Sequence, residues 1–392
     1  MNAMKKQPTV IVGGGFGGVY TAKHLLKKDL PVLLISETNY FTFTPLLHEV
    51  ATGNLTRSDI IFEYESFFKN KQFEFLRGTV TNIDTEKKEV CIGKDRVPYT
   101  HLVLATGATT NYYRLKGEEH VLPLKTIDEA VAIKKRLVEL AQGSSKNVCV
   151  NVIGGGPTGV ELILEIEQFL RAIAKRTANL AYEIRLIQGG NTILPFFGMP
   201  IQEYAKRVLK QQGIKIAYGG YATEATKSSI KTTNGTYTSN LTIMAAGVTP
   251  RTKCAHKNFL NEKKHVCVNE YLQIKGTKQS FALGDSIMQN GEPIPKLAQT
   301  AVAQAEIVAE NIARQKQKHK LTPYHSNVKG TAISLGYGKG AAEVFGVNIK
   351  GFPAWWLWRT IYLFKTPGLR NKLRVAFSWT LDLFNGKNLS EG

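Results

Sequence analysis

The stretch VIVGGGFGG, residues 10–18, is matched by NVIGGGPTG at residues 151–159. In both copies an apolar run ends in the pattern G-x-G-x-x-G, and a helical pattern follows. This arrangement presents backbone N–H groups and a helix N-terminus to a pyrophosphate. One copy alone is weak evidence. Two copies predict two dinucleotides in one chain, and therefore electron transfer between them.

A second pair of landmarks strengthens this prediction. Ala105-Thr106-Gly107 follows the first loop and Ala245-Ala246-Gly247 follows the second, each after an apolar, strand-like run. Matching start and end marks indicate a duplicated nucleotide-binding domain. Two unrelated turn glycines are the alternative explanation, which four landmarks in register make much weaker than a duplication. We therefore expect an α/β fold with two Rossmann-like dinucleotide-binding domains.

Composition limits the class of protein. The 392 residues are enough for two or three domains, and a net charge of +20 points to an anionic partner, either nucleic acid or a membrane face. Colloidal solubility is the alternative explanation. The four cysteines form no C-x-x-C pair, which argues against a redox disulfide and a four-cysteine zinc site; no metal site is predicted. The first strand starts near Thr9 and leaves no room for a signal peptide, so we expect a cytoplasmic protein.

The strand that follows each glycine loop ends where a ribose usually binds. The first ends at Ser36-Glu37, where Glu37 offers a carboxylate and Ser36 a hydroxyl; the sequence leaves both open. The second ends at Gln188. Because Gln188 lacks the negative charge that repels a 2′-phosphate, we expect weaker discrimination against NADPH.

Several acidic residues and one histidine are candidates for chemistry. Glu161 lies in the predicted first turn of the second helix, where it could be a helix-dipole partner, orient a nicotinamide amide or relay a proton. Asp285 follows an apolar strand and is either a surface turn residue or a ligand of the first nucleotide. His48 and Glu49 are predicted to be surface or helix-capping residues, since the sequence shows no partner for them.

The C-terminal segment raises the question of a membrane. Residues 353–365 contain three of the four tryptophans, and basic residues gather at the start of the following helix: Arg370, Lys372 and Arg374. One face of that helix is predicted to carry Leu369, Leu373, Ala376, Phe377, Thr380, Leu381 and Phe384. Neither stretch reaches the roughly 18 apolar residues of a spanning helix. The pattern favours helices lying in the membrane interface over a helix docked on the core or on a second subunit.

Taken together, these motifs resemble the type II NADH:quinone oxidoreductases, which are single-subunit respiratory flavoenzymes that pump no protons. The resemblance covers nearly the whole chain. It rests on both glycine loops, the loop from Asn39 to Gly53, the 102–112 segment, the 281–285 strand end, the Ala298-Gln299 helix and the tail from Lys350 to Phe384.

The resemblance implies specific roles. Glu161 would orient the nicotinamide and Gln299 the quinone. FAD would be held by Gly13, Gly15, Phe16, Gly18, Ser36, Glu37, Thr44, Val80, Ala105, Thr106, Gly107, Gly284, Asp285, Leu297 and Ala298. NADH, with NADPH as a second possible donor, would be held by Gly154, Gly156, Pro157, Thr158, Gly159, Gln188, Ala246 and Gly247. Quinone would be the acceptor, near Gln299, Ala303 and Gln304; here Ala303 stands where the family usually has a second glutamine, and Gln304 follows one step later.

The resemblance also implies an organisation. The FAD-binding domain would comprise residues 1–113 and 251–325, the NAD(P)H-binding domain residues 114–250, and a membrane-anchoring region residues 326–392. We expect a homodimer, attached peripherally to the cytoplasmic face of the cell membrane, with no nucleic acid partner. A sulfide:quinone oxidoreductase is the alternative enzyme, although it needs two reactive cysteines near the flavin. A basic flavoprotein that binds nucleic acid is the non-enzymatic alternative, although no nucleic-acid module is recognisable.

Overall fold

The computed structural model describes residues 7–143, 147–176, 180–327 and 330–385. Contacts divide the chain into two compact units. The first unit comprises Met1–Thr42, Ile61–Thr109 and Val248–Val328. The second unit comprises Phe43–Ile60, Thr110–Gly247 and Lys329–Gly392. The short segment 43–60 and the C-terminal region therefore both group with the second glycine loop.

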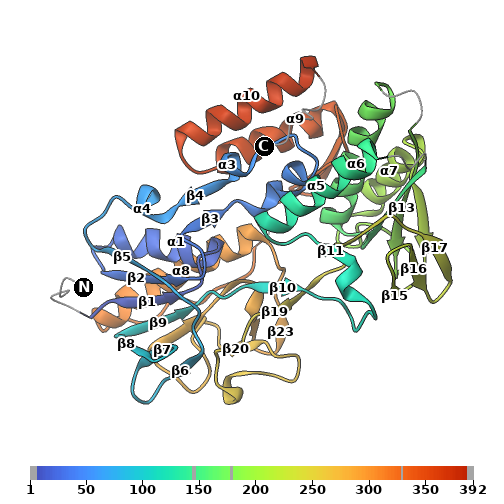
Figure 1. Cartoon of the computed structure of the whole chain (residues 1–392). Helices are drawn as coiled ribbons and strands as arrows, with labels where there is room; N and C mark the ends of the chain where they lie inside the picture. The colour runs from blue at the N-terminus through green and yellow to red at the C-terminus, as the bar shows by residue number, and fades with distance from the viewer. Residues whose placement is uncertain (1–6, 144–146, 177–179, 328–329, 386–392) are drawn as a thin grey trace. The chain divides into compact units, whose positions relative to one another are not determined.

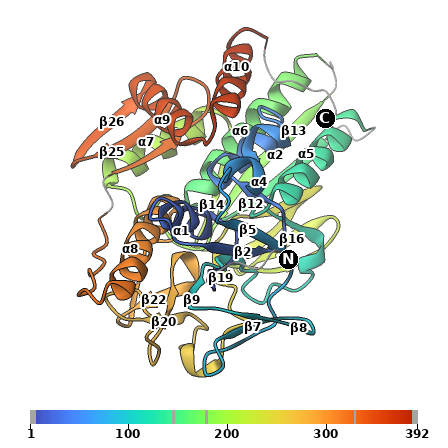
Figure 2. The same ribbon diagram turned by 90° about the vertical axis from the view of Figure 1, so that its left-hand side faces the viewer.

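The first unit is built on a five-stranded parallel sheet with the order β21-β9-β1-β2-β5. These strands are Ser280–Ala282, His101–Leu104, Thr9–Val12, Val32–Ser36 and Phe73–Arg77, in that order. The strands β1 and β9 are buried throughout, as expected for a parallel sheet covered on both faces. The helices α1 (Phe16–Leu26) and α8 (Ala298–Lys316) run side by side against this sheet (Figures 1 and 2).

Smaller elements complete the first unit. They are β3 (Tyr40–Thr42), β4 (Ile61–Glu63), α4 (Tyr64–Phe67), β6 (Asn82–Asp84), β7 (Glu89–Ile92), β8 (Asp95–Pro98), β10 (Ala108–Thr110, which ends at the unit boundary), β19 (Val248–Pro250), η3 (Lys257–Phe259), β20 (Val266–Val268), η4 (Gly284–Ser286), β22 (Ile287–Gln289) and β23 (Glu292–Pro293). The strands β6, β7 and β8 form an antiparallel sheet of their own.

The second unit repeats the same topology. Its parallel sheet has the order β11-β18-β12-β13-β14, with strands Val121–Pro123, Leu241–Met244, Asn147–Ile153, Ala181–Gln188 and Lys215–Tyr218. In each sheet the strand before the glycine loop, β1 or β12, is central. It pairs on one side with the next strand of the βαβ unit and on the other with the strand that precedes the second landmark. The predicted α/β fold with two Rossmann-like domains is confirmed.

The remaining elements of the second unit surround this sheet. They are η1 (Thr44–Leu46), α2 (Leu47–Ala51), α3 (Arg57–Ile60), η2 (Glu118–His120), α5 (Ile127–Gln142), α6 (Pro157–Ala174), α7 (Met199–Gln211), β15 (Ala222–Ala225), β16 (Ser229–Thr232), β17 (Gly235–Thr238), β24 (Gly330–Ser334), β25 (Gly340–Val344), β26 (Val347–Gly351), α9 (Phe352–Lys365) and α10 (Leu369–Asn385).

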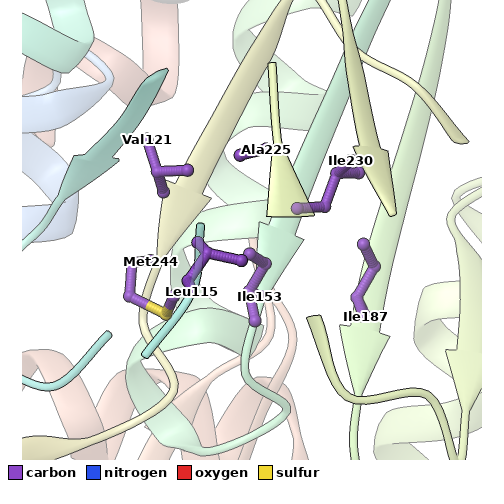
Figure 3. Close-up of a cluster of buried hydrophobic side chains, with 7 residues drawn as sticks. All are labelled: Leu115, Val121, Ile153, Ile187, Ala225, Ile230 and Met244. Carbon is purple, nitrogen blue, oxygen red and sulfur yellow. The ribbon is translucent and has the colours of Figure 1, made fainter. Parts of the chain in front are cut away.

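Apolar side chains at the ends of the second sheet form a buried cluster (Figure 3). Ile153, Ile187 and Met244 come from three parallel strands, and Ala225 and Ile230 from the antiparallel sheet β15-β16-β17. Burying each larger side chain contributes about 1.5–3 kcal/mol. The cluster therefore fixes the small sheet beside the carboxyl ends of β12, β13 and β18.

The C-terminal region docks through a close backbone approach. The helix α9 lies on the antiparallel sheet β24-β25-β26. A Cβ atom added to Gly340 would lie 2.5 Å from the backbone nitrogen of Trp355, so only glycine permits this packing. Within the described ranges, no helix has the length and apolar character needed to span a bilayer.

Candidate nucleotide-binding loops and a buried carboxylate cluster

The first glycine of each loop lies against the backbone of the second landmark. Gly13 has φ +108° and Gly154 has φ +115°, a region that favours glycine. A Cβ atom at Gly13 would lie 2.2 Å from the carbonyl oxygen of Ala105, and one at Gly154 would lie 2.5 Å from that of Ala245. In each unit, the landmark that follows the loop in sequence therefore lies beside that loop, at the point where the strand order of the sheet reverses. Sheets of this kind bind their ligands at this point.

The last glycine of each loop allows the helix to pack closely on its strand. A Cβ atom would lie 1.9 Å from the oxygen of Gly13 if added to Gly18, and 1.9 Å from the oxygen of Gly154 if added to Gly159. These equal distances show that the two loops share one backbone conformation.

The middle glycine of each loop faces open space. A Cβ atom added to Gly15 or Gly156 would have no described atom within 4 Å. Both residues are helix N-caps without a side-chain hydrogen bond, and neither α1 nor α6 has an acidic residue in its first turn. The N-termini of both helices therefore face open space, and their positive dipole ends favour an anion there. Both loops fit the pyrophosphate of a dinucleotide.

The end of each second strand contacts its loop. Ser36 Oγ would lie 2.8 Å from a Cβ at Gly14, whereas Glu37 forms an ion pair with Arg251 at 2.7 Å. Of the two residues that the sequence left open, Ser36 is thus the one beside the loop. In the second unit, Gln188 Oε1 accepts a hydrogen bond from the Gly155 N–H at 2.8 Å, and its Nε2 donates to the Thr192 carbonyl at 2.9 Å.

The predicted flavin residue Asp285 lies in the turn η4, which Gln304 holds in place. Gly284, with φ +80°, donates its N–H to Gln304 Oε1 at 2.8 Å. Gln304 is completely buried in α8, and its Nε2 has no partner among the described residues. Thr300, one helical turn earlier, also has a buried hydroxyl without a described partner. Unsatisfied buried polar atoms beside this turn fit an additional polar group, such as a cofactor.

The other predicted residues are distributed between the two units. Gln299 is half-buried at the start of α8, next to Leu297 and Ala298, and Ala303 is exposed on the same helix. Gln304 therefore occupies a different face of α8 from Ala303. Val80 lies in the first unit, between β5 and β6, whereas Thr44 belongs to the second unit.

Glu161 lies at the centre of a buried carboxylate cluster in the second unit. It is the fifth residue of α6, just beyond the first turn in which it was predicted, and Pro157 begins the helix. Its Oε1 accepts hydrogen bonds at 3.1 Å from the Ser334 N–H and from the Trp358 indole Nε1–H. Burial raises the pKa of Glu161 to about 8, although both hydrogen bonds act in the opposite direction.

The prediction for His48 and Glu49 is wrong, because both side chains are buried, with 3% and 4% exposure. His48 Nδ1 lies 3.9 Å from Glu161 Oε2. Glu49 Oε2 accepts a hydrogen bond from the Trp379 indole at 2.6 Å. From the sequence, Trp358 and Trp379 were assigned to the membrane-anchoring tail. Their carboxylate partners could not be predicted, because Glu161 and Glu49 are 197 and 330 residues away in sequence.

The comparisons with known proteins identify the family. Residues 7–305 match the family described as Pyridine nucleotide-disulphide oxidoreductase. The chain belongs to this family. Both glycine loops and the turn at Asp285 lie within the matched residues.

More specific relatives carry the name that the motifs suggested. A type II NADH:quinone oxidoreductase of Mycobacterium tuberculosis is 28% identical over 96% of this chain and 88% of its own length. One from Haemophilus influenzae is 26% identical over 96% of this chain and 97% of its own length. The solved structure of NDH2 from Plasmodium falciparum in complex with NADH has a TM-score of 0.91 and 21% identity, covering 99% of this chain and 100% of that one. The resemblance to type II NADH:quinone oxidoreductases is confirmed.

Proposed function

We propose that this protein is a membrane-associated flavoenzyme that oxidises NADH and reduces a quinone without pumping protons. The overall reaction consumes NADH, a proton and a quinone, and releases NAD⁺ and a quinol. The observation that carries the proposal is the duplicated loop geometry. Two loops with matching close contacts at Gly13 and Gly154, and open space at Gly15 and Gly156, offer two pyrophosphate sites in one chain.

The first unit would hold FAD. Its loop would bind the pyrophosphate and Ser36 would face the adenosine ribose, while Asp285 would bind the ribityl or phosphate portion. A bound flavin supplies the two-electron chemistry, and the protein positions and insulates it. We propose that Gln304 holds the Gly284–Asp285 turn against this cofactor and does not bind quinone, since its side chain is buried and accepts the Gly284 N–H.

The second unit would hold NADH. Its loop would bind the pyrophosphate, and Glu161 would orient the nicotinamide. Gln188 brings no negative charge to the ribose position, and both ends of its amide group bond to the backbone. We therefore propose that NADPH is also accepted, with a preference for NADH smaller than an acidic residue at this position would give.

The C-terminal helices would attach the enzyme to the cytoplasmic face of the membrane. Phe364, Leu373 and Phe377 are 73%, 62% and 64% exposed, while Val375 and Trp379 on α10 are buried. The exposed face of α10 is thus the apolar one predicted from sequence; the side chains of Leu381 and Phe384 lie outside the described part. Exposed apolar side chains beside Arg370, Lys372 and Arg374 suit an anionic bilayer surface. A homodimer remains a prediction from the resemblance.

A sulfide:quinone oxidoreductase is less well supported. That chemistry requires reactive thiolates, which have lowered pKa values. Burial raises the pKa of both Cys149 and Cys254. All four cysteines are free thiols.

The proposal is tested by steady-state turnover in anionic liposomes that contain a quinone. We expect NADH-dependent quinol formation by the wild type. Gln299→Ala is expected to slow quinol formation at least tenfold while NADH still bleaches the flavin. Unchanged quinol formation in this variant would remove Gln299 from the quinone site.

A further inference from the structure

Two indole groups of the C-terminal helices bind two buried carboxylates of the second unit. Trp358 of α9 donates to Glu161 of α6 at 3.1 Å, and Trp379 of α10 donates to Glu49 of α2 at 2.6 Å. Both tryptophans are almost completely buried, and their ring centroids are 5.8 Å apart. Neither side chain is available to a lipid bilayer, unlike Trp356, which is 59% exposed on the same α9 helix.

Arg359 joins the two helices that carry these indoles. Its guanidinium lies 4.1 Å from the ring centroid of Trp355 and 5.1 Å from that of Trp379. It also donates to the Trp379 carbonyl at 3.3 Å. Stacked guanidinium groups restrain aromatic rings through cation–π attraction. The positions of the two indoles are therefore coupled, and both depend on how α9 and α10 are seated.

Glu161 is sensitive to the loss of any one donor. Its neighbours are His48 and Glu49 from α2, Glu165 from its own helix, the Ser334 N–H from β24, and Trp358 and Tyr362 from α9. The carboxylates of Glu49 and Glu165 disfavour a negative charge on Glu161, and burial disfavours it further. Hydrogen bonds to the charged form favour it. Trp358 and Ser334, both from the C-terminal region, supply these bonds.

We propose that Trp358 is a positioning residue for Glu161, and that the paired contacts Trp358–Glu161 and Trp379–Glu49 form an indole latch. The latch makes the charge and orientation of the nicotinamide-site carboxylate depend on the seating of the membrane-attaching helices. This inference rests on the proposed function, because it assigns a regulation to the same NADH site. Its consequence is specific: the C-terminal helices control the oxidation of NADH as well as access to the membrane.

The test compares Trp358→Phe with Trp356→Phe. The first variant keeps an aromatic ring but removes the N–H donor to Glu161. The second makes the same chemical change two residues away on the same helix, where the side chain is exposed. The measurement is the anaerobic rate of flavin reduction by NADH in stopped flow, recorded from pH 5.5 to 9.5 in the full-length, flavin-loaded protein.

The expected result is a shift of the midpoint in the pH profile. A hydrogen bond to a charged group contributes about 1.5–3 kcal/mol, so its loss moves a pKa by about one unit or more. Trp358→Phe is expected to raise the midpoint by about one pH unit, and Trp356→Phe to leave it unchanged. In a Glu161→Gln background, Trp358→Phe is expected to cause no further shift. A general loss of stability would lower the rate at every pH without moving the midpoint.

A second measurement needs no change at Trp358. Fluorine NMR of protein labelled with 5-fluorotryptophan gives one resonance for each of the four tryptophans. Substituting Trp355, Trp356 and Trp379 one at a time assigns three of these resonances and leaves the fourth to Trp358. The Trp358 resonance is expected to titrate with the same midpoint as the flavin-reduction rate, whereas the Trp356 resonance stays constant.

The possible failures can be told apart. If NADH does not bleach the flavin of the wild type, the proposed function fails. If the wild type is bleached but the profiles of Trp358→Phe, Trp356→Phe and wild type superpose, the indole latch is overturned and the proposed function stands. A Trp358 fluorine resonance that does not change with pH would also overturn the latch.

Discussion

At the residue scale, the glycines of the two loops have separable roles. Gly154 is required by the fold, because its φ is +115° and an added Cβ would lie 2.5 Å from the Ala245 oxygen. No described neighbouring atom requires glycine at Gly156, because the space around it is open, so we expect that only a bound nucleotide would require it. The sequence pattern assigned both glycines to nucleotide binding, which stays a prediction. The pattern could not show which glycine the fold requires and which one leaves space for a ligand, because this depends on how closely other backbone segments approach each glycine.

Substitution of these two glycines should therefore give different outcomes. Gly156→Ala should fold normally, with an unchanged melting temperature, while its KM for NADH rises at least tenfold because the methyl group occupies the pyrophosphate space. Gly154→Ala should lower the melting temperature or prevent folding. Calorimetry and steady-state kinetics measure the two effects. Equal loss of stability in both variants would contradict the assignment of Gly156.

The buried carboxylate of Glu161 has a consequence for stability. Its pKa in the folded protein, about 8, lies above the ordinary value of 4.5, so the folded state binds the proton more tightly than the unfolded state. The contribution of Glu161 to stability is therefore fully present below about pH 4.5 and is lost as the pH rises toward 8.

Glu161→Gln should remove this dependence. The variant should gain stability relative to the wild type as the pH rises from 5 to 8, by an amount on the order of a few kcal/mol. Denaturant unfolding of both proteins at pH 5, 6.5 and 8 measures the difference. A constant difference between variant and wild type across this range would show that Glu161 has an ordinary pKa.

At the scale of the elements, the helix α8 could be predicted from the sequence, but the contacts of its side chains could not. The helix was predicted, and Gln304 was assigned to the quinone site. Its structural role was not predicted, because sequence spacing does not show that Gln304 reaches back to the turn η4 and accepts the Gly284 N–H. The same applies to α9 and α10, whose apolar exposed face was predicted while the buried indoles at Trp358 and Trp379 were not.

Gln304 and Gln299 should therefore affect different steps. Gln304→Leu leaves the Gly284 N–H without its acceptor and should weaken FAD binding by about tenfold or more, since an unsatisfied buried donor costs about 1–3 kcal/mol. Gln299→Ala, on the same helix, should retain FAD as the wild type does. The dissociation constant for FAD, measured by reconstitution of the apoprotein, decides between these expectations; full FAD affinity in Gln304→Leu would contradict the proposal.

The exposed face of α10 should govern membrane binding. Replacing Leu373 and Phe377 by glutamate adds negative charge to that face and removes apolar contact, so sedimentation with anionic vesicles should fall at least tenfold. The matched control replaces Phe345 and Val347 by glutamate, which adds the same two negative charges at exposed apolar side chains in and beside the turn between β25 and β26. Equal loss of binding in both proteins would mean that general negative charge, and not α10, determines attachment.

At the scale of the whole molecule, the chain is a duplicated dinucleotide fold with a C-terminal addition. The duplication could be predicted because each close backbone contact of the two loops requires a glycine, and these glycines recur at the same positions in both copies of the sequence pattern. The division into units could not be predicted in full. Residues 43–60 group with the second unit because Asn54 donates to Glu165 at 2.6 Å and Trp379 donates to Glu49, contacts that span more than a hundred residues of sequence.

In the proposed reaction, electrons pass from a nicotinamide through a flavin in this one chain to a quinone. Anaerobic double-mixing stopped flow tests it most directly. The protein is mixed first with one equivalent of NADH and then with a soluble quinone, while flavin absorbance near 450 nm is followed. We expect complete bleaching in the first step and full recovery in the second, with one quinol formed for each NADH. Absence of bleaching by NADH, or a bleached flavin that quinone does not reoxidise, would show that the chain does not carry electrons from NADH to quinone.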